Sequence, residues 1–226
     1  MLFQNIMYVV YLVACYLIAL NVLRKNPKNR ENQMLCTSFI LLGSFGTCIL
    51  IYSIFNQIII ILIFSRLAYI CAGFSMYLLY LVFGTIAHSK EWRRTHYALY
   101  LVILVVYSIV FFAWPGAVGV IDPDLPLTYI NEVMLGIIFF LVIFFLINTL
   151  VYLWKYGIVK TEGKRKARMK EVFVGVLLSL IALVFGGIEI IFLGNIVLYL
   201  LLDGLFLATL ALSIFIIGRG FIKSSE

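Results

Sequence analysis

The sequence predicts an all-α membrane protein, a bundle of seven transmembrane helices with its N-terminus outside and its C-terminus in the cytoplasm. Three observations predict this fold class. Of 226 residues, 65% are hydrophobic and only 12% are charged, against roughly 25% charged in an ordinary soluble domain. The apolar residues gather in seven runs, each near or above the about 20 residues that cross a bilayer. Finally, nearly all basic residues lie in or beside the connections on one side of the predicted membrane.

The seven apolar runs are separated by short polar or charged gaps. We place the predicted helices at residues 2–23, 34–55, 58–87, 96–114, 129–156, 170–193 and 196–217. No basic residue precedes the first run and no small-residue cleavage site follows it, so we expect a retained helix and not a signal peptide. The gaps leave no room for an extramembrane domain, and we expect residues 1–226 to form one domain.

The distribution of the basic residues predicts the orientation. Every Lys and Arg except Arg66 lies at the C-terminus or in or beside the gaps after the first, third and fifth runs, whereas the gaps at 56–57, 115–128 and 194–195 contain none. Because short basic loops stay in the cytoplasm, this asymmetry predicts an N-out, C-in protein of the plasma membrane. The same loops are expected to bind anionic lipid headgroups. A docking surface on the fifth-to-sixth loop is the alternative, and the clustering excludes nucleic acid despite a net charge of +7.

Few ionisable residues fall inside the predicted helices, and each is a candidate functional residue because a charge in hydrocarbon is costly. Arg66 lies about 12 Å in from the outer start of the third helix, at 1.5 Å per residue. Asp203 lies at a similar depth in the seventh helix, Glu189 lies near the outer end of the sixth, and Glu132 lies at the outer start of the fifth. We expect Arg66 to pair with Asp203 or Glu189, or to hold a carboxylate or phosphate of a ligand. A purely structural pair and separately solvated charges stay open.

Two helices show stripes at three- and four-residue spacing, which place side chains on one face. The third helix carries an aromatic and polar stripe at Arg66, Tyr69, Gly73, Tyr77, Tyr80 and Gly84. The sixth carries small residues at Gly175, Ser179, Ala182 and Gly186, a pattern that permits close helix contact in lipid. The candidate ligand-binding residues in the outer half are Arg66, Tyr69, Glu132, Glu189, Tyr199 and Asp203. Packing alone is the alternative interpretation of both stripes.

The connection between the fourth and fifth predicted helices is the one outer gap long enough to form a lid. It holds Pro115, Pro123 and Pro126, which stop a helix and stiffen a loop. Asp122 and Asp124 in the same gap would attract cations. A plain turn is the alternative, and we favour the turn.

Several absences narrow the chemistry. The seventh predicted helix has no lysine at mid-depth to form a Schiff base with retinal. His88 and His96 flank an inner loop while the buried acids lie near the outer face, so they cannot share a hydrolase site. The four cysteines fall inside predicted helices without metal-ligand spacing. We therefore expect a non-enzyme without a cofactor or metal.

Three short segments resemble one family. The segment Asn26-Pro-Lys-Asn-Arg30 resembles the first cytoplasmic turn of the seven-helix region at the N-terminus of many prokaryotic histidine kinases. The run Phe64-Ser-Arg66-Leu67-Ala-Tyr69 is similar to its third helix, and Lys164-Arg-Lys-Ala-Arg168 to the start of its sixth. The resemblance covers the whole chain at the level of topology. It implies a sensor whose helices pass a signal to a cytoplasmic output.

The chain ends at Glu226 without a kinase, so we expect either an excised sensor region or a protein that signals through a cytoplasmic partner. The predicted function is a receptor-like membrane sensor that binds a small ligand in the outer half of the bundle. Association as a homodimer stays open. A small secondary transporter is one alternative, since Arg66 and Asp203 at similar depth hint at a repeat, but no proline interrupts a predicted span. A structural membrane subunit is the other alternative.

The predicted orientation can be tested by labelling introduced cysteines from outside intact cells. A membrane-impermeant reagent should modify Asp124→Cys, in a gap without basic residues, but not Thr161→Cys, in the most basic loop. The wild-type chain, with its native cysteines inside predicted helices, serves as the control. The reverse labelling pattern would overturn the topology.

Overall fold

The computed structural model describes the chain except residues 1, 56, 89, 123–126, 192–194 and 223–226. Pro123, Asp124, Pro126 and Lys223, which the sequence analysis used, lie outside the described residues. The long helices are α1 (Leu2–Lys25), α2 (Arg30–Ile54), α3 (Ile58–Ala87), α4 (Lys90–Ala113), α5 (Glu132–Tyr152), α6 (Gly163–Ile191) and α7 (Ile196–Ile222). Within the described residues, seven helices are long and apolar enough to cross a membrane. The prediction of an all-α bundle with seven such helices is confirmed.

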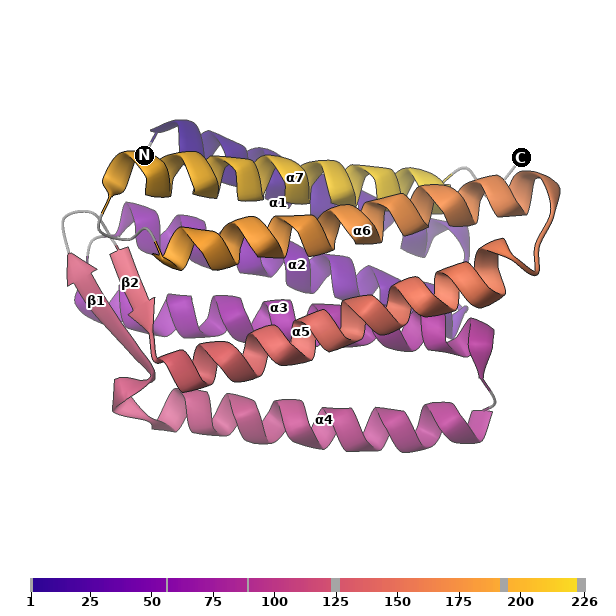
Figure 1. Ribbon diagram of the computed structural model, residues 1–226, viewed down its shortest axis with the longest axis horizontal. Helices are drawn as coiled ribbons and strands as arrows, with labels where there is room; N and C mark the ends of the chain where they lie inside the picture. The colour runs from indigo at the N-terminus through magenta and orange to yellow at the C-terminus, as the bar shows by residue number, and fades with distance from the viewer. Residues whose placement is uncertain (1, 56, 89, 123–126, 192–194, 223–226) are drawn as a thin grey trace.

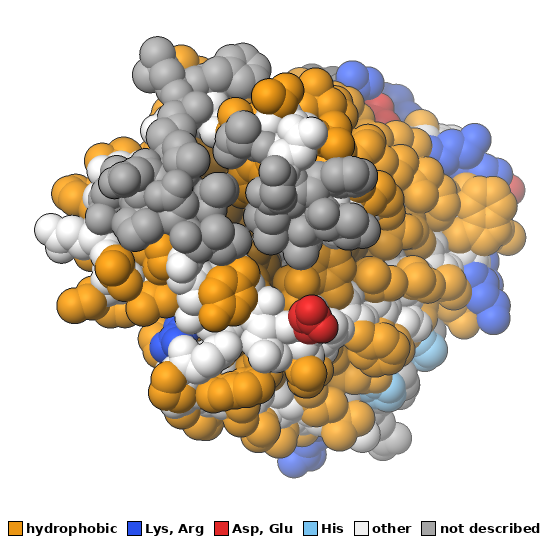
Figure 2. Space-filling model, turned by 60° about the vertical axis from the view of Figure 1, so that its left-hand side comes forward, with side chains coloured by type: hydrophobic (Ala, Val, Ile, Leu, Met, Phe, Trp, Pro, Cys, Tyr) orange, Lys and Arg blue, Asp and Glu red, His pale blue; other side chains and the backbone are white. Residues whose placement is uncertain are grey.

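The bundle has two distinct ends (Figure 1). We call the end at which α1 begins and a short β-hairpin lies the hairpin end. The opposite end, where α1 and α7 finish and α6 begins, we call the basic end, because most Lys and Arg residues lie there. Figure 2 turns the hairpin end forward and shows hydrophobic side chains over most of the visible sides, with Lys and Arg gathered mainly toward the basic end on the right.

Six of the helices close a ring, and α4 stands outside it. The neighbours around the ring are α1, α2, α3, α5, α6 and α7, and α7 packs back on α1. Helix α4 packs chiefly on α3 and runs along the lower edge of the bundle in Figure 1. Apolar residues on its outer face, such as Val102 and Ile109, are exposed, as expected for a helix that faces lipid. The space inside the ring is therefore bounded by six helices.

Several helix boundaries differ by three residues or more from the predicted ones, among them the start of α2 at Arg30 and the end of α7 at Ile222. Helices α4 and α6 begin earlier than predicted, at Lys90 and Gly163, and α5 begins later, at Glu132, but continues as the π-helical turn η2 (Leu153–Ile158). The predicted starts of α4 and α6 were placed where apolar residues begin, but Lys and Arg are good helix formers. Their long side chains also reach polar surroundings from the end of an apolar helix. The helices therefore run on through their charged first turns.

The connection after α4, for which we favoured a plain turn, forms a hairpin instead. A single 3₁₀ turn, η1 (Pro115–Ala117), leads into the antiparallel strands β1 (Val118–Asp122) and β2 (Leu127–Ile130). Gly119 pairs with Tyr129, whose ring lies where a Cβ on Gly119 would be. Asn131 then joins the hairpin to α5, because its N–H donates to the Ala117 carbonyl at 2.9 Å and its side chain accepts from the N–H of Val133 at 3.0 Å.

The basic-end half of the ring is filled by aromatic side chains. Tyr77 and Tyr80 of α3 and Phe145 of α5 are each at most 1% exposed. The ring centroid of Phe145 lies 5.8 Å from that of Tyr77 and 5.3 Å from that of Tyr80, which are distances typical of favourable aromatic pairs. The aromatic stripe predicted on the third helix is core packing at these two positions. Space for a ligand is therefore to be sought nearer the hairpin end.

Helices α6 and α7 form the most extensive seam between helices. The Oγ atoms of Ser179 and Ser213 lie 2.6 Å apart, and Ser213 Oγ donates to the Gly175 carbonyl at 2.8 Å. All three residues are buried. At the basic end, Arg219 of α7 contacts Glu171 of α6 at 3.0 Å. The predicted small-residue stripe thus permits the close helix contact for which such stripes are known.

Substitution of Gly175 by alanine should weaken this seam. A Cβ there would lie 2.5 Å from Ile217 Cγ1 and 3.0 Å from the Ser213 carbonyl oxygen, and the backbone atom cannot rotate away. We expect a loss of about 1–3 kcal/mol, measured as a lower unfolding temperature of the purified protein in detergent. The control is Gly204→Ala in α7, which has no atom within 4 Å of the new Cβ and should keep or slightly raise the stability. Equal behaviour of the two variants would contradict the close seam.

Candidate functional site

A cavity lies inside the ring of helices in its hairpin-end half. Its volume is about 180 Å³, and its lining comes from α1, α2, α3, β2, α5, α6 and α7. Most of the lining side chains are aliphatic or aromatic. A cavity of about 150 Å³ is enough to hold benzene. This cavity can therefore take a small organic molecule.

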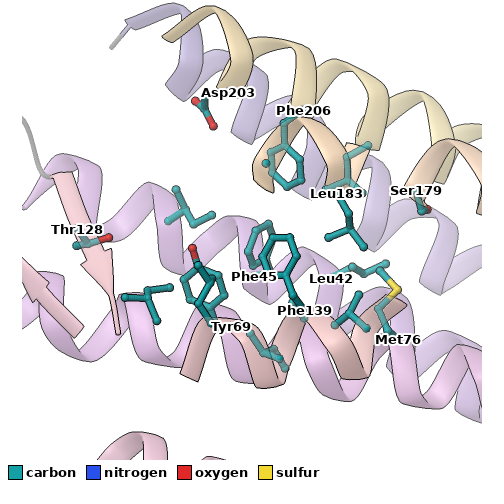
Figure 3. A pocket seen from close by; sticks show the side chains of 18 of the residues that line it. Leu42, Phe45, Tyr69, Met76, Thr128, Phe139, Ser179, Leu183, Asp203 and Phe206 are labelled. Atoms are coloured by element: carbon teal, nitrogen blue, oxygen red, sulfur yellow. The ribbon is translucent and has the colours of Figure 1, made fainter. Parts of the chain in front are cut away.

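The lining runs from the hairpin to the middle of the bundle. Thr128 and Tyr129 of β2, together with Tyr199 in the first turn of α7, line the part nearest the hairpin end. The deepest lining residues lie close to the midpoints of their helices: Leu42, Met76, Ser179 and Leu210 (Figure 3 labels the first three). Nearer the basic end, the aromatic side chains of Tyr77, Tyr80 and Phe145 fill the ring. The cavity thus ends at mid-bundle.

Asp203 is the one charged residue among the described residues that line the cavity. Its side chain is 6% exposed. Gln4 Nε2 donates to one carboxylate oxygen at 2.6 Å, and the Tyr8 hydroxyl donates to the other at 3.2 Å. In Figure 3 the Asp203 carboxylate and the Tyr69 hydroxyl are directed toward the same space from opposite sides. The carboxylate therefore ties α7 to α1 through two neutral donors and faces the cavity.

Of the two predicted partners of Arg66, Asp203 is wrong, and Glu189 stays a prediction because its side chain lies outside the described part of the chain. Arg66 Nη1 donates to the Phe112 carbonyl at 3.0 Å, and Nη2 donates to the carbonyls of Trp114 and Pro115 at 3.2 and 3.3 Å. The last carbonyls of a helix have no partners within that helix, and a cation stabilises this negative end. The guanidinium therefore caps the C-terminal end of α4 and is not among the residues that line the cavity.

The other predicted site residues divide into three groups. Tyr69 and Tyr199 line the cavity, as Asp203 does. Glu132 is exposed at the first position of α5 and is not part of the lining. The side chain of Glu189 lies outside the described part of the chain. The structure thus brings Tyr69, Tyr199 and Asp203 together and leaves Arg66 and Glu132 apart from them.

The sequence analysis missed the two partners of Asp203. Gln4 and Tyr8 lie one helical turn apart in α1, and neither is charged. A signal was present, because Gln4 and the adjacent Asn5 are polar side chains near the outer start of a mainly apolar first run, on the side of the membrane where Asp203 is expected. Its significance depends on α1 packing against α7, which connects the first helix to the last.

The chain was also compared with known proteins. No protein-family model matches it, and no curated protein matches its sequence. The resemblance to the histidine-kinase sensor region therefore stays a prediction.

Replacement of Arg66 should affect stability without any coupling to Asp203. Arg66→Met removes the donor to the carbonyls of Phe112 and Pro115, while the Trp114 carbonyl keeps the N–H of Ala117; the change should cost about 1–3 kcal/mol. Arg66→Lys should cost less, since an ammonium keeps the charge but not the planar fork. In a double-mutant cycle with Asp203→Asn, measured by unfolding in detergent, the two losses should add within about 0.5 kcal/mol. A coupling energy well above this value would show that Arg66 and Asp203 interact, as the sequence suggested.

Proposed function

We propose that the chain is a receptor-like membrane sensor that binds a small, mainly apolar ligand in the hairpin-end cavity and signals to a cytoplasmic partner. The observation that carries this proposal is the position of the cavity. It extends from the hairpin to mid-bundle and ends on Ser179, which is itself part of the α6–α7 seam. A ligand in this cavity would therefore touch the helix pair whose packing it has to change.

A path for the signal follows from contacts along the seam. Ser179 meets Ser213 at the cavity floor, and Gly175 lies one turn farther along α6. Farther toward the basic end, Glu171 and Arg219 join the same two helices. Closely packed helices shift between discrete arrangements and do not deform continuously. A change of packing at Ser179 would therefore change the relative position of α6 and α7 at the basic end.

The distribution of charge supports the orientation needed for such a sensor. The basic residues around the α5–α6 connection favour a cytoplasmic location for the basic end in the plasma membrane. These residues would bind anionic lipid headgroups and offer a surface to a signalling partner. The ligand would then enter at the hairpin end, from outside. The resemblance to histidine-kinase sensor regions supports the same arrangement.

Transport is the less favoured function. A transporter needs a substrate path that continues to the opposite side by alternating access, with its site usually formed by interrupted helices. The cavity instead stops above Tyr77, Tyr80 and Phe145, which are almost fully buried. We therefore favour binding with signalling over binding with passage.

A bulky side chain placed in the cavity should abolish binding. Leu183 lines the cavity, whereas the next residue, Val184, is 55% exposed on the outside of α6. Purified Leu183→Trp should no longer bind the neutral aromatic probe 2-phenylethanol in equilibrium dialysis, because the indole occupies the space. Val184→Trp, the matched control, should bind as the wild-type chain does. Equal binding by both variants, each shown to be folded, would contradict the proposed site.

A further inference from the structure

We propose that the ligand is an organic cation, an amine or ammonium group on a compact apolar body, with its charged nitrogen at Asp203. This inference rests on the proposed function and adds the chemical class of the ligand. It follows from the one charged group among the described lining residues, from the partners of that group, and from the character of the other lining residues.

The charge balance of Asp203 favours a cationic ligand. A carboxylate removed from water needs a compensating charge or several hydrogen bonds. Asp203 is 6% exposed, and its two described hydrogen bonds come from a neutral amide and a neutral hydroxyl. Among the described lining residues there is no Lys, Arg or His. A cationic ligand would place a positive charge inside the cavity, directly beside this carboxylate.

The carboxylate of Asp203 also has capacity for further hydrogen bonds. A carboxylate offers about four acceptor positions, and each Asp203 oxygen accepts one described bond, from Gln4 or from Tyr8. An ammonium N–H can therefore bind beside these donors or replace Gln4. Replacement would loosen the link between α1 and α7 that Asp203 makes.

The other lining residues suit a cation that carries an apolar body. Aromatic side chains surround the space, and Phe45, Tyr69, Phe139 and Phe206 lie around it in Figure 3. The faces of aromatic rings attract cations. The same surfaces accommodate an apolar body. An amine with an aromatic or aliphatic body fits both properties of the lining.

Two other ligand classes fit less well. An anion would be repelled by Asp203, and the terminal nitrogens of Arg66 already donate to carbonyls of the α4 end. A metal ion needs several oxygen, nitrogen or sulfur ligands, but the described residues contain no group of three His, Cys, Asp or Glu side chains that could hold one. An organic cation needs only the single carboxylate.

The experiment compares two probes of nearly equal shape, 2-phenylethylamine and 2-phenylethanol, at pH 7. Binding of each radiolabelled probe to the purified protein in neutral detergent is measured by equilibrium dialysis. The cavity-filled Leu183→Trp variant supplies the blank for partition into micelles. We expect the amine to bind at least about tenfold more tightly than the alcohol, since hydrogen bonds to charged groups contribute about 1.5–3 kcal/mol.

Variants assign this preference to Asp203. Asp203→Asn should bring the two probes to within about twofold of each other, while Asp203→Glu, which keeps the carboxylate, should restore part of the preference and carries the test if the Asn variant does not fold. Glu132→Gln removes an exposed acid at the same end of the bundle and should leave the preference unchanged.

The outcomes separate this inference from the proposed function. If both probes bind equally to the wild-type chain, the cavity is a binding site but the ligand is not selected as a cation, and this inference is overturned alone. A preference for the amine that survives in Asp203→Asn overturns the role of Asp203. If neither probe binds above the level of Leu183→Trp, both proposals fail.

Discussion

Polar groups inside an apolar bundle have to find partners within the protein, and the main features of this structure follow from that constraint. An unpaired backbone or side-chain polar group costs several kcal/mol in hydrocarbon. Ser38 and Ser75 meet this requirement by exchanging hydrogen bonds between α2 and α3, with their Oγ atoms 3.0 Å apart. Between α6 and α7, the hydroxyls of Ser179 and Ser213 share one hydrogen bond, and Ser213 Oγ donates to the Gly175 carbonyl. Each pair fixes the register of two neighbouring helices, and together they position opposite sides of the ring.

The same constraint separates two charges that the sequence placed at one depth. The terminal nitrogens of Arg66 donate to carbonyls at the end of α4, so this side chain attaches the helix outside the ring to α3 and supports the start of the hairpin. Asp203 accepts hydrogen bonds from Gln4 and Tyr8, so it closes the ring where α7 returns to α1. With Arg66 directed away, the carboxylate is the charged group among the described residues of the cavity. The ligand preference proposed for the cavity depends on this separation.

The sequence predicted the number of helices because the thickness of a bilayer determines the length of an apolar run. It did not predict the early starts of α4 and α6, since hydropathy falls where Lys and Arg begin although the helix continues. The hairpin was missed because two short strands give little periodic signal beside the prolines of that connection. For Arg66, the sequence gives depth along a helix but not the order of helices around the ring. That order places Asp203 beside Gln4 and Tyr8, and it can be derived only from tertiary packing.

The central claim is that a molecule in the hairpin-end cavity changes the packing of α6 at the basic end. Pulsed electron–electron double resonance measures the distance between two spin labels. One label replaces Lys164 on the first turn of α6, and the other replaces Lys28 in the α1–α2 turn. Addition of 2-phenylethylamine should shift the distance distribution of the labelled protein, and Leu183→Trp should abolish the shift. An unchanged distribution in protein shown by dialysis to have bound the probe would contradict the account, because the cavity would then be occupied without any effect on the helices that are proposed to carry the signal.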